Sequence, residues 1–419
     1  MDAPSALACL AAARRAAQHP DARWPGWDFD AHPVGLALPE GLLLWGHPSP
    51  PPGFAPLPLP AGGDAPPGPL HLGPVPDGLA NSTLDLGGRR VATARLADTA
   101  PGPGAVRLIV HEAFHAFQAQ VRPDAGVPSQ QTADYPEEDA ANNALARAEN
   151  ACLAAFLEGT RGAAECARDL TALRAVRYAC LDPAWPAYEA AAEWCEGGAQ
   201  LAEALVSGPG ERPAWAAALR RLNRAGEGAA YRRFYASGAA IGLLLAELLP
   251  GWRARWLAPG ATPTGLLQAA GGEPRDAAAV LGDYGVADLL AEEAAATAAR
   301  RREIEGLLAQ WVPALVVEVA AAPPTSFGFD PTRRRVLSGG RQLHGGWTRL
   351  AGPGWVFDVP EGPVLEDRRA GSLTLPLPVG LCLDPGRGAL ALPLLRAEAA
   401  RVARGEAGGW RIVIEREAR

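Results

Sequence analysis

Apolar residues recur three or four positions apart over most of the middle of the chain, which is the spacing of one buried face of a helix. Proline, glycine and aspartate divide this pattern into segments, as expected where helices begin and end. We therefore predict helices over Glu137–Leu157, Ala163–Ala179, Pro186–Val206, Pro213–Arg224, Ala229–Leu249, Thr264–Ala270 and Val286–Trp311. An amphipathic stretch that ends in Arg14 and Arg15 predicts one more helix at the N-terminus.

Another helix is predicted over Ala105–Gln120. It follows the run Pro101-Gly102-Pro103-Gly104, which breaks regular structure, and no glycine or proline occurs after it before Pro123. Its apolar residues have the spacing of a buried face: Val106, Ile109, Val110, Phe114 and Phe117.

The two ends of the chain follow a different pattern. Residues 48–76 are rich in proline, which predicts extended backbone. Thr83–Leu86 and Val91–Leu96 flank a Gly-Gly pair and predict a hairpin. After Val312, short β-rich runs between glycine and proline turns predict strands, with one short helix near Arg396–Arg404.

These patterns predict an α+β fold in three parts. Residues 1–100 form a proline-rich segment with a short β-hairpin, packed on the domain that follows. Residues 101–322 form a mostly helical domain, and residues 323–419 a β-rich domain. A chain of 419 residues is long enough for such a division and for a large core.

Composition excludes several classes of partner. The 39 basic residues, all arginine, face 46 acidic ones, and no basic run suggests a nucleic-acid partner. No apolar segment reaches the ~18 residues of a membrane span. The N-terminus carries Asp2 where a signal peptide would be basic, so we expect a cytoplasmic protein. The six cysteines form no CxxC motif, and the four in the helical stretch 152–195 are expected to be buried thiols.

The pattern His111-Glu112-Ala113-Phe114-His115 points to metal chemistry. On a helix, the two histidines project from one face, close enough to share a metal ion. Glu112 then lies beside the metal, where a carboxylate can accept a proton from a metal-bound water. Three protein ligands plus a water make a catalytic zinc site, so a third ligand is required. The next histidine, His344, is far along the chain, which favours a carboxylate.

The segment Glu193-Trp194-Cys195-Glu196-Gly197-Gly198 resembles the "EGLAEY" helix start of gluzincin-type metallopeptidases. The wider order HEAFHAFQ, NALARAENACL, DLTALRAVRYA, EGGA and FYASGAAIGLLL resembles uncharacterised bacterial zincin-like HExxH proteins over residues 85–310. The resemblance implies a zincin-like catalytic domain with Glu196 as the third ligand. Glu149 remains an alternative, because its spacing is nearer to that of thermolysin-like enzymes, and Glu193 is expected to orient a ligand histidine instead.

The expected function is a zinc (Zn2+) metallopeptidase acting on a peptide substrate, with Glu112 as general base and general acid. Tyr235 is the expected donor to the tetrahedral intermediate, with Arg233 and Tyr231 as competitors. The alternative is a zincin-like binding or scaffold protein without activity. We also expect the proline-rich segment or the β-rich domain to cover the zinc cleft and to restrict it to short peptides.

Overall fold

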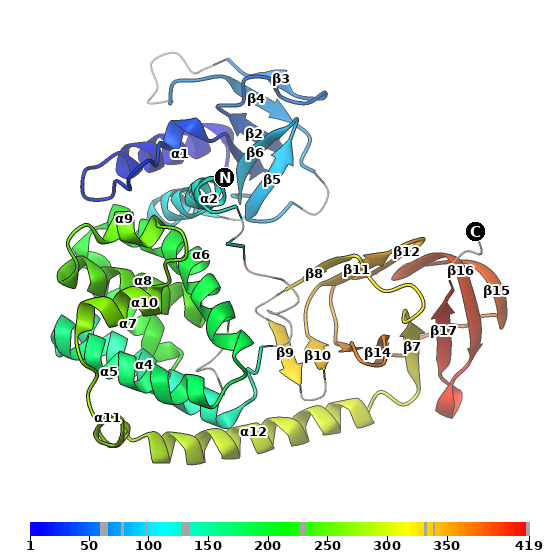
Figure 1. The fold of residues 1–419 in the computed structure, drawn as a ribbon. Helices are drawn as coiled ribbons and strands as arrows, with labels where there is room; N and C mark the ends of the chain where they lie inside the picture. Colours follow the sequence, from blue (N-terminus) through cyan, green and yellow to red (C-terminus); the bar gives the residue numbers. More distant parts are fainter. Residues whose placement is uncertain are drawn as a thin grey trace. The chain divides into compact units, whose positions relative to one another are not determined.

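The computed structural model describes residues 1–58, 66–76, 79–97, 99–123, 125–126, 135–226, 231–330, 333–337 and 340–415. Helices and strands are both abundant, which confirms the α+β class (Figure 1). The chain divides into two compact units. The first unit comprises Met1–Pro128 and Ala144–Leu289, and the second comprises Ser129–Asn143 and Leu290–Arg419.

A six-stranded sheet occupies the N-terminal part of the first unit, with the strand order β3-β4-β2-β1-β6-β5. The predicted hairpin is present as β5 and β6, and the two turn glycines have positive φ angles that fit a tight hairpin turn. The sequence did not predict the remaining strands. The bounds are β1 (Val34–Leu38), β2 (Gly41–Trp45), β3 (Ala55–Pro56), β4 (Leu70–Gly73), β5 (Ser82–Leu86) and β6 (Arg89–Arg95).

Helices make up the rest of the first unit, and the periodicity predicted most of them to within a few residues. The bounds are α1 (Ala3–Ala17), α2 (Pro103–Val121), α4 (Ala140–Leu157), α5 (Ala163–Ala179), α6 (Ala184–Ser207), α7 (Arg212–Arg221), α8 (Arg233–Leu248) and α10 (Pro263–Gly271). Two short helices, α9 (Trp252–Leu257) and α11 (Ala277–Asp283), were not predicted, because one or two turns carry too little periodicity.

Helix α2 is the element that joins the sheet to the helices. It contacts β5 and β6 of the sheet as well as the helices α1 and α6. Aromatic residues from the N-terminal segment pack around it: the rings of Trp24 and Trp27 lie 4.9 and 5.0 Å from that of Phe114. The first hundred residues therefore supply part of the core that holds α2.

The second unit contains most of α12 (Val286–Ala309) and a sheet with the order β8-β11-β12-β16-β17-β7-β14-β13-β10-β9, in which β15 also pairs with β16. The first strand of this sheet begins at Ala314, whereas the β-rich domain was expected from residue 323. The strand bounds are β7 (Ala314–Glu318), β8 (Ser326–Phe329), β9 (Arg334–Leu337), β10 (Arg341–His344), β11 (Thr348–Gly352), β12 (Trp355–Val359), β13 (Val364–Asp367), β14 (Ser372–Pro376), β15 (Gly386–Leu392), β16 (Leu395–Arg404) and β17 (Trp410–Ile414).

The short helix expected near Arg396–Arg404 is wrong. Residues Leu395–Arg404 form strand β16, which pairs with β12, β15 and β17. Its buried side chains Leu395, Ala397, Ala400 and Val402 enter the core of the second unit. Pairing on both sides has overridden the helical preference of its alanine, glutamate and arginine residues.

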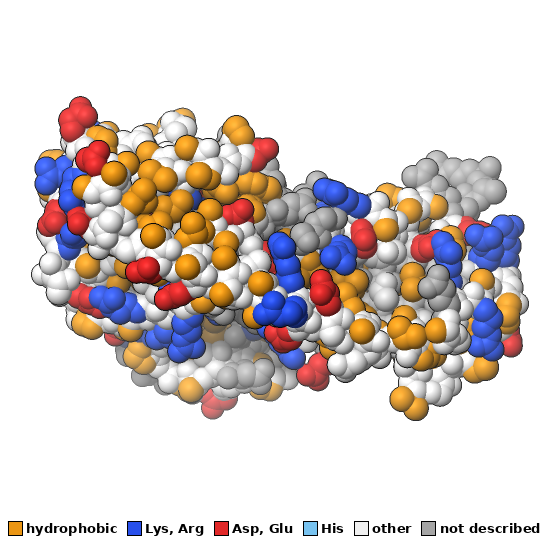
Figure 2. Space-filling view, turned by 90° about the horizontal axis from the view of Figure 1, so that it is seen from below, with side chains coloured by type: hydrophobic (Ala, Val, Ile, Leu, Met, Phe, Trp, Pro, Cys, Tyr) orange, Lys and Arg blue, Asp and Glu red, His pale blue; other side chains and the backbone are white. Residues whose placement is uncertain are grey.

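The surface agrees with the mixed charge of the sequence. On the face shown in Figure 2, acidic and basic side chains are interspersed with apolar ones among the residues described. Within the same described residues, no helix combines the length and the apolar composition that a bilayer crossing requires.

Candidate metal centre

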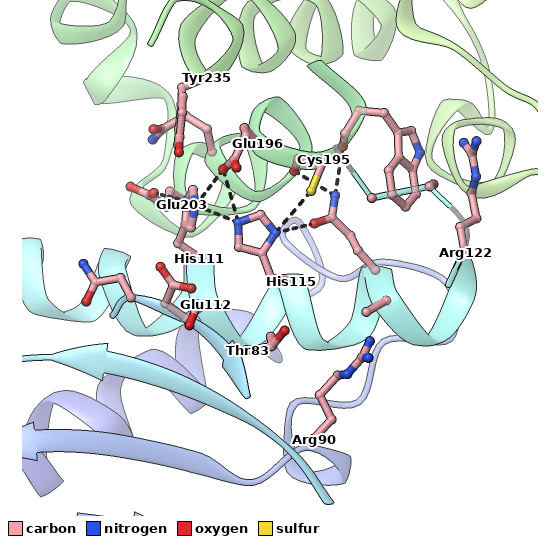
Figure 3. A pocket seen from close by; sticks show the side chains of 18 of the residues that line it. Thr83, Arg90, His111, Glu112, His115, Arg122, Cys195, Glu196, Glu203 and Tyr235 are labelled. Carbon is pink, nitrogen blue, oxygen red and sulfur yellow. Dashed lines mark hydrogen bonds and ion pairs between the residues drawn. The ribbon is translucent and has the colours of Figure 1, made fainter. Parts of the chain in front are cut away.

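Helix α2 presents both histidines of the HExxH motif on one face (Figure 3). The Nε2 atoms of His111 and His115 lie 3.0 Å apart. The Nδ1 atoms point away from one another to carbonyl or carboxylate oxygens, so each Nδ1 carries the proton and each Nε2 is left as an acceptor. The two unprotonated nitrogens therefore converge on one point, as metal ligands do.

Glu196 on α6 completes a group of three ligand atoms. Its Oε2 lies 3.3 Å from Nε2 of His115 and 3.7 Å from Nε2 of His111. The three ligand atoms lie within 4.8 Å of one another. The structure thus brings together the three residues that the sequence nominated as ligands.

Two glycines allow α6 to approach both neighbouring helices. A Cβ atom on Gly198 would lie 2.7 Å from Nε2 of Gln118 on α2, and one on Gly197 would lie 2.5 Å from Cα of Gly238 on α8. Both distances are far below a van der Waals contact. The Gly-Gly pair after Glu196 therefore determines how deeply the ligand carboxylate reaches toward α2.

Two further side chains orient the histidines. Nδ1–H of His111 donates to Glu203 at 2.7 Å, and Nδ1–H of His115 donates to Oε1 of Gln118 at 2.9 Å. The amide of Gln118 in turn donates to the carbonyl oxygens of Trp194 and Cys195 on α6, both at 2.9 Å. Such partners fix ring orientation and raise the basicity of the ligand.

Glu193 does not have the orienting role expected for it; Glu203 does. Glu203 lies two helical turns after Glu196 on the same face of α6, which is the one sequence signal that could have indicated it. Gln118 completes the sequence HEAFHAFQ and holds α6 against α2 through its two bonds to that helix.

Glu149 and Glu193 belong to a buried network of ion pairs away from the ligand atoms. Glu149 contacts Nε of Arg177 at 2.6 Å, and Glu193 contacts Nη2 of Arg174 at 2.5 Å. Arg233 also pairs with Glu149. Burial raises the pKa of Glu149, but the three arginines lower it to about 2. The structure therefore does not bring Glu149 to the histidines, and its carboxylate is already neutralised by guanidinium groups.

Glu112 lies beside the three ligands without contacting a cation. Its side chain is buried, and its Oε2 has no hydrogen-bond partner among the described residues. Burial raises the pKa of this carboxyl above its ordinary value. A buried carboxylate with a free oxygen and a raised pKa suits a group that accepts and returns a proton.

The three candidate donors to a reaction intermediate have different surroundings; they are Tyr235, Tyr231 and Arg233. Tyr235 lines the cavity, and its ring stacks on that of His111 with centroids 5.8 Å apart and an interplanar angle of 12°. Tyr231 donates its hydroxyl to Oε1 of Glu196 at 3.0 Å. Arg233 is fully buried in the ion-pair network. Tyr235 is therefore the candidate whose side chain faces the cavity.

A cavity of about 580 Å³ opens over the three ligands. Its wall on one side comes from Asn81, Ser82, Thr83 and Arg90 on and next to β5 and β6, and the opposite wall comes from α6 and Tyr235. The N-terminal segment, which we expected as one possible cover of the cleft, thus borders the cavity. A cover formed by the C-terminal β-rich part stays a prediction.

No family model, no curated protein and no solved structure matches the chain. The resemblance to zincin-like proteins therefore rests on the motifs quoted from the sequence.

Proposed function

We propose that the protein is a zinc-dependent hydrolase that cleaves peptide bonds, with His111, His115 and Glu196 as the zinc ligands. One observation carries the proposal: the ligand atoms of these three residues converge within 4.8 Å, beside the buried and unpaired Oε2 of Glu112. A site that only stored a metal would have no use for an unpaired carboxylate beside it. We expect the enzyme to act in the cytoplasm.

The donor set fits zinc. Two imidazole nitrogens and one carboxylate oxygen are the ligands of many catalytic zinc sites, which leave a position for water or substrate. Two unprotonated nitrogens and a carboxylate oxygen that face one another repel unless a cation lies between them. Glu203 and Gln118 hold both histidines in the tautomer that such a cation requires.

The side chains around the ligands supply the proton transfers. Zinc, when bound, would polarise the scissile carbonyl and acidify a water molecule. Glu112 would take the proton of that water on Oε2 and pass it to the leaving amine. The hydroxyl of Tyr235 would donate to the carbonyl oxygen as negative charge develops there. Burial holds the pKa of Tyr235 above its ordinary value, so the phenol keeps its proton and remains a donor.

A peptide substrate is supported by the wall opposite α6. Strand β5 is an edge strand of the N-terminal sheet, and Ser82 and Thr83 on this strand line the cavity. An extended peptide can pair with the open edge of such a strand through its main chain, which gives affinity without a fixed sequence. A cavity of about 580 Å³ suits a ligand of a few residues.

The test is substitution of the expected base. Glu112→Gln should retain one zinc ion for each chain and lose turnover of an unstructured peptide library by orders of magnitude, because an amide cannot accept the proton. Glu247→Gln is the matched control, since this glutamate is exposed on α8 and pairs with Arg212 at the surface. Equal turnover by wild type and Glu112→Gln would refute the mechanism. Zinc binding by both, with no peptide cleaved by either, would favour the scaffold alternative.

A further inference from the structure

The charged side chains that line the cavity are segregated by sign. Glu112, Glu196 and Glu203 surround the histidines, whereas the basic residues Arg90 and Arg122 lie toward the C-terminal end of α2 (Figure 3). Arg122 follows His115 by about two helical turns, which places it roughly 10 Å further along the helix axis. The cavity therefore has an acidic end, where the reaction is proposed to occur, and a basic end.

Arg90 has no partner that neutralises it. It projects from β6, and the described residues provide neither an ion pair nor a hydrogen bond to its guanidinium. Asp85 is its cross-strand neighbour, but the carboxylate of Asp85 accepts a hydrogen bond from the backbone N–H of Gly88 instead. A guanidinium without a partner at a cavity wall can bind an anion with several N–H donors.

Arg122 is held in a fixed position but is not neutralised. One of its N–H groups donates to the carbonyl oxygen of Ala261 at 2.9 Å, and its guanidinium lies 4.5 Å from the centre of a ring of Trp194. Neither contact brings a negative charge. Stacking on an indole orients the planar group and leaves its remaining N–H donors for a ligand.

We propose that Arg90 and Arg122 bind a carboxylate of the substrate, so that the enzyme selects peptides with a negative charge about two or three residues from the scissile bond. This spacing follows from the roughly 10 Å between His115 and Arg122 along the axis of α2 and about 3.3 Å for each extended residue. The inference rests on the proposed peptidase function.

A carboxylate at this distance has two sources, a free C-terminus or an acidic side chain. Three peptides separate these two sources: acetylated tetra-alanine with a terminal carboxylate, the same peptide with a terminal carboxamide, and a carboxamide peptide that ends in aspartate. Binding is measured by calorimetry on zinc-loaded Glu112→Gln protein, so that no peptide is consumed. The carboxylate forms should bind about tenfold or more tightly than the neutral peptide, since hydrogen bonds to charged groups are among the stronger ones.

The variants locate the effect. Arg90→Gln should reduce the preference for the carboxylate severalfold, whereas Arg89→Gln, one residue earlier on β6 and outside the cavity lining, should not. Arg122→Gln is the second variant to be tested. If it does not fold, Arg122→Lys, which keeps the positive charge, replaces it. Equal binding of the carboxylate and the carboxamide, or no binding of either, would overturn the inference. Neither outcome bears on the proposed function, which is tested separately by turnover and zinc content in wild type and Glu112→Gln.

Discussion

Replacing Glu149 with glutamine tests the division between ligand and structural carboxylates. The side chain is fully buried and contacts Arg174, Arg177 and Arg233. The substitution preserves shape but leaves three buried guanidinium groups with too few carboxylates. Breaking a buried ion pair from one side costs about 3–5 kcal/mol. That is a large share of the ~5–15 kcal/mol that stabilises an ordinary domain.

The measurement is urea unfolding of metal-free protein, followed by helical circular dichroism, because most helices belong to the first unit. Glu158→Gln is the control: Glu158 pairs with Arg220 near the surface, where such a pair is worth at most about 1 kcal/mol. Below the unfolding transition, Glu149→Gln should still bind one zinc ion for each chain. Normal stability together with lost zinc would refute the reasoning and make Glu149 a ligand.

Acid provides a second signature of the same network. The pKa of Glu149 is about 2 in the folded protein against an ordinary value of 4.5. A lowered pKa contributes stability that is complete above the ordinary value and is lost as the pH falls toward the folded one. The stability advantage of wild type over Glu149→Gln should therefore shrink as the pH decreases below 4.5, and an advantage that grew would contradict the assignment.

Three further substitutions and one control separate the roles at the candidate metal centre. His111→Ala should abolish stoichiometric zinc by elemental analysis, whereas His344→Ala, which breaks a hydrogen bond to Glu366 in the second unit, should not. Glu203→Gln should weaken zinc about 10–100-fold in competition with a chelator, and unchanged affinity would remove its orienting role. Tyr235→Phe should keep zinc and lower kcat about 10²–10³-fold, and an unaltered kcat would exclude its hydroxyl as the donor.

Long periodic segments made much of the fold predictable. The helix over Ala163–Ala179 was predicted to the residue, and α2 was placed to within two residues at its start. Strands β1 and β2 were missed because their side chains are almost all buried, so their sequence is uniformly apolar instead of alternating. Strand β16 was taken for a helix because its alanine, glutamate and arginine residues favour a helix, whereas pairing with β12, β15 and β17 determines its conformation.

The candidate site was predictable where its chemistry is local. Two histidines four positions apart on a helix lie close together regardless of the surrounding structure. The motif around Glu196 singled out one glutamate as their partner. The roles of Glu149, Glu193 and Glu203 were not accessible in this way. Each depends on which cation or ring faces it in the folded chain, and the only local signal is the two-turn spacing between Glu196 and Glu203.

The contact between Gly197 and Gly238 has a consequence for loss of the metal. At this point α6 and α8 meet backbone to backbone, so neither helix can slide without opening the core. Glu196 thus occupies its position through helix packing, before any ion arrives. Small zinc domains unfold when a chelator removes their metal, because the metal supplies the folding energy. In this protein a large apolar core supplies the folding energy. A chelator should therefore yield a folded, inactive protein that regains activity when zinc is restored.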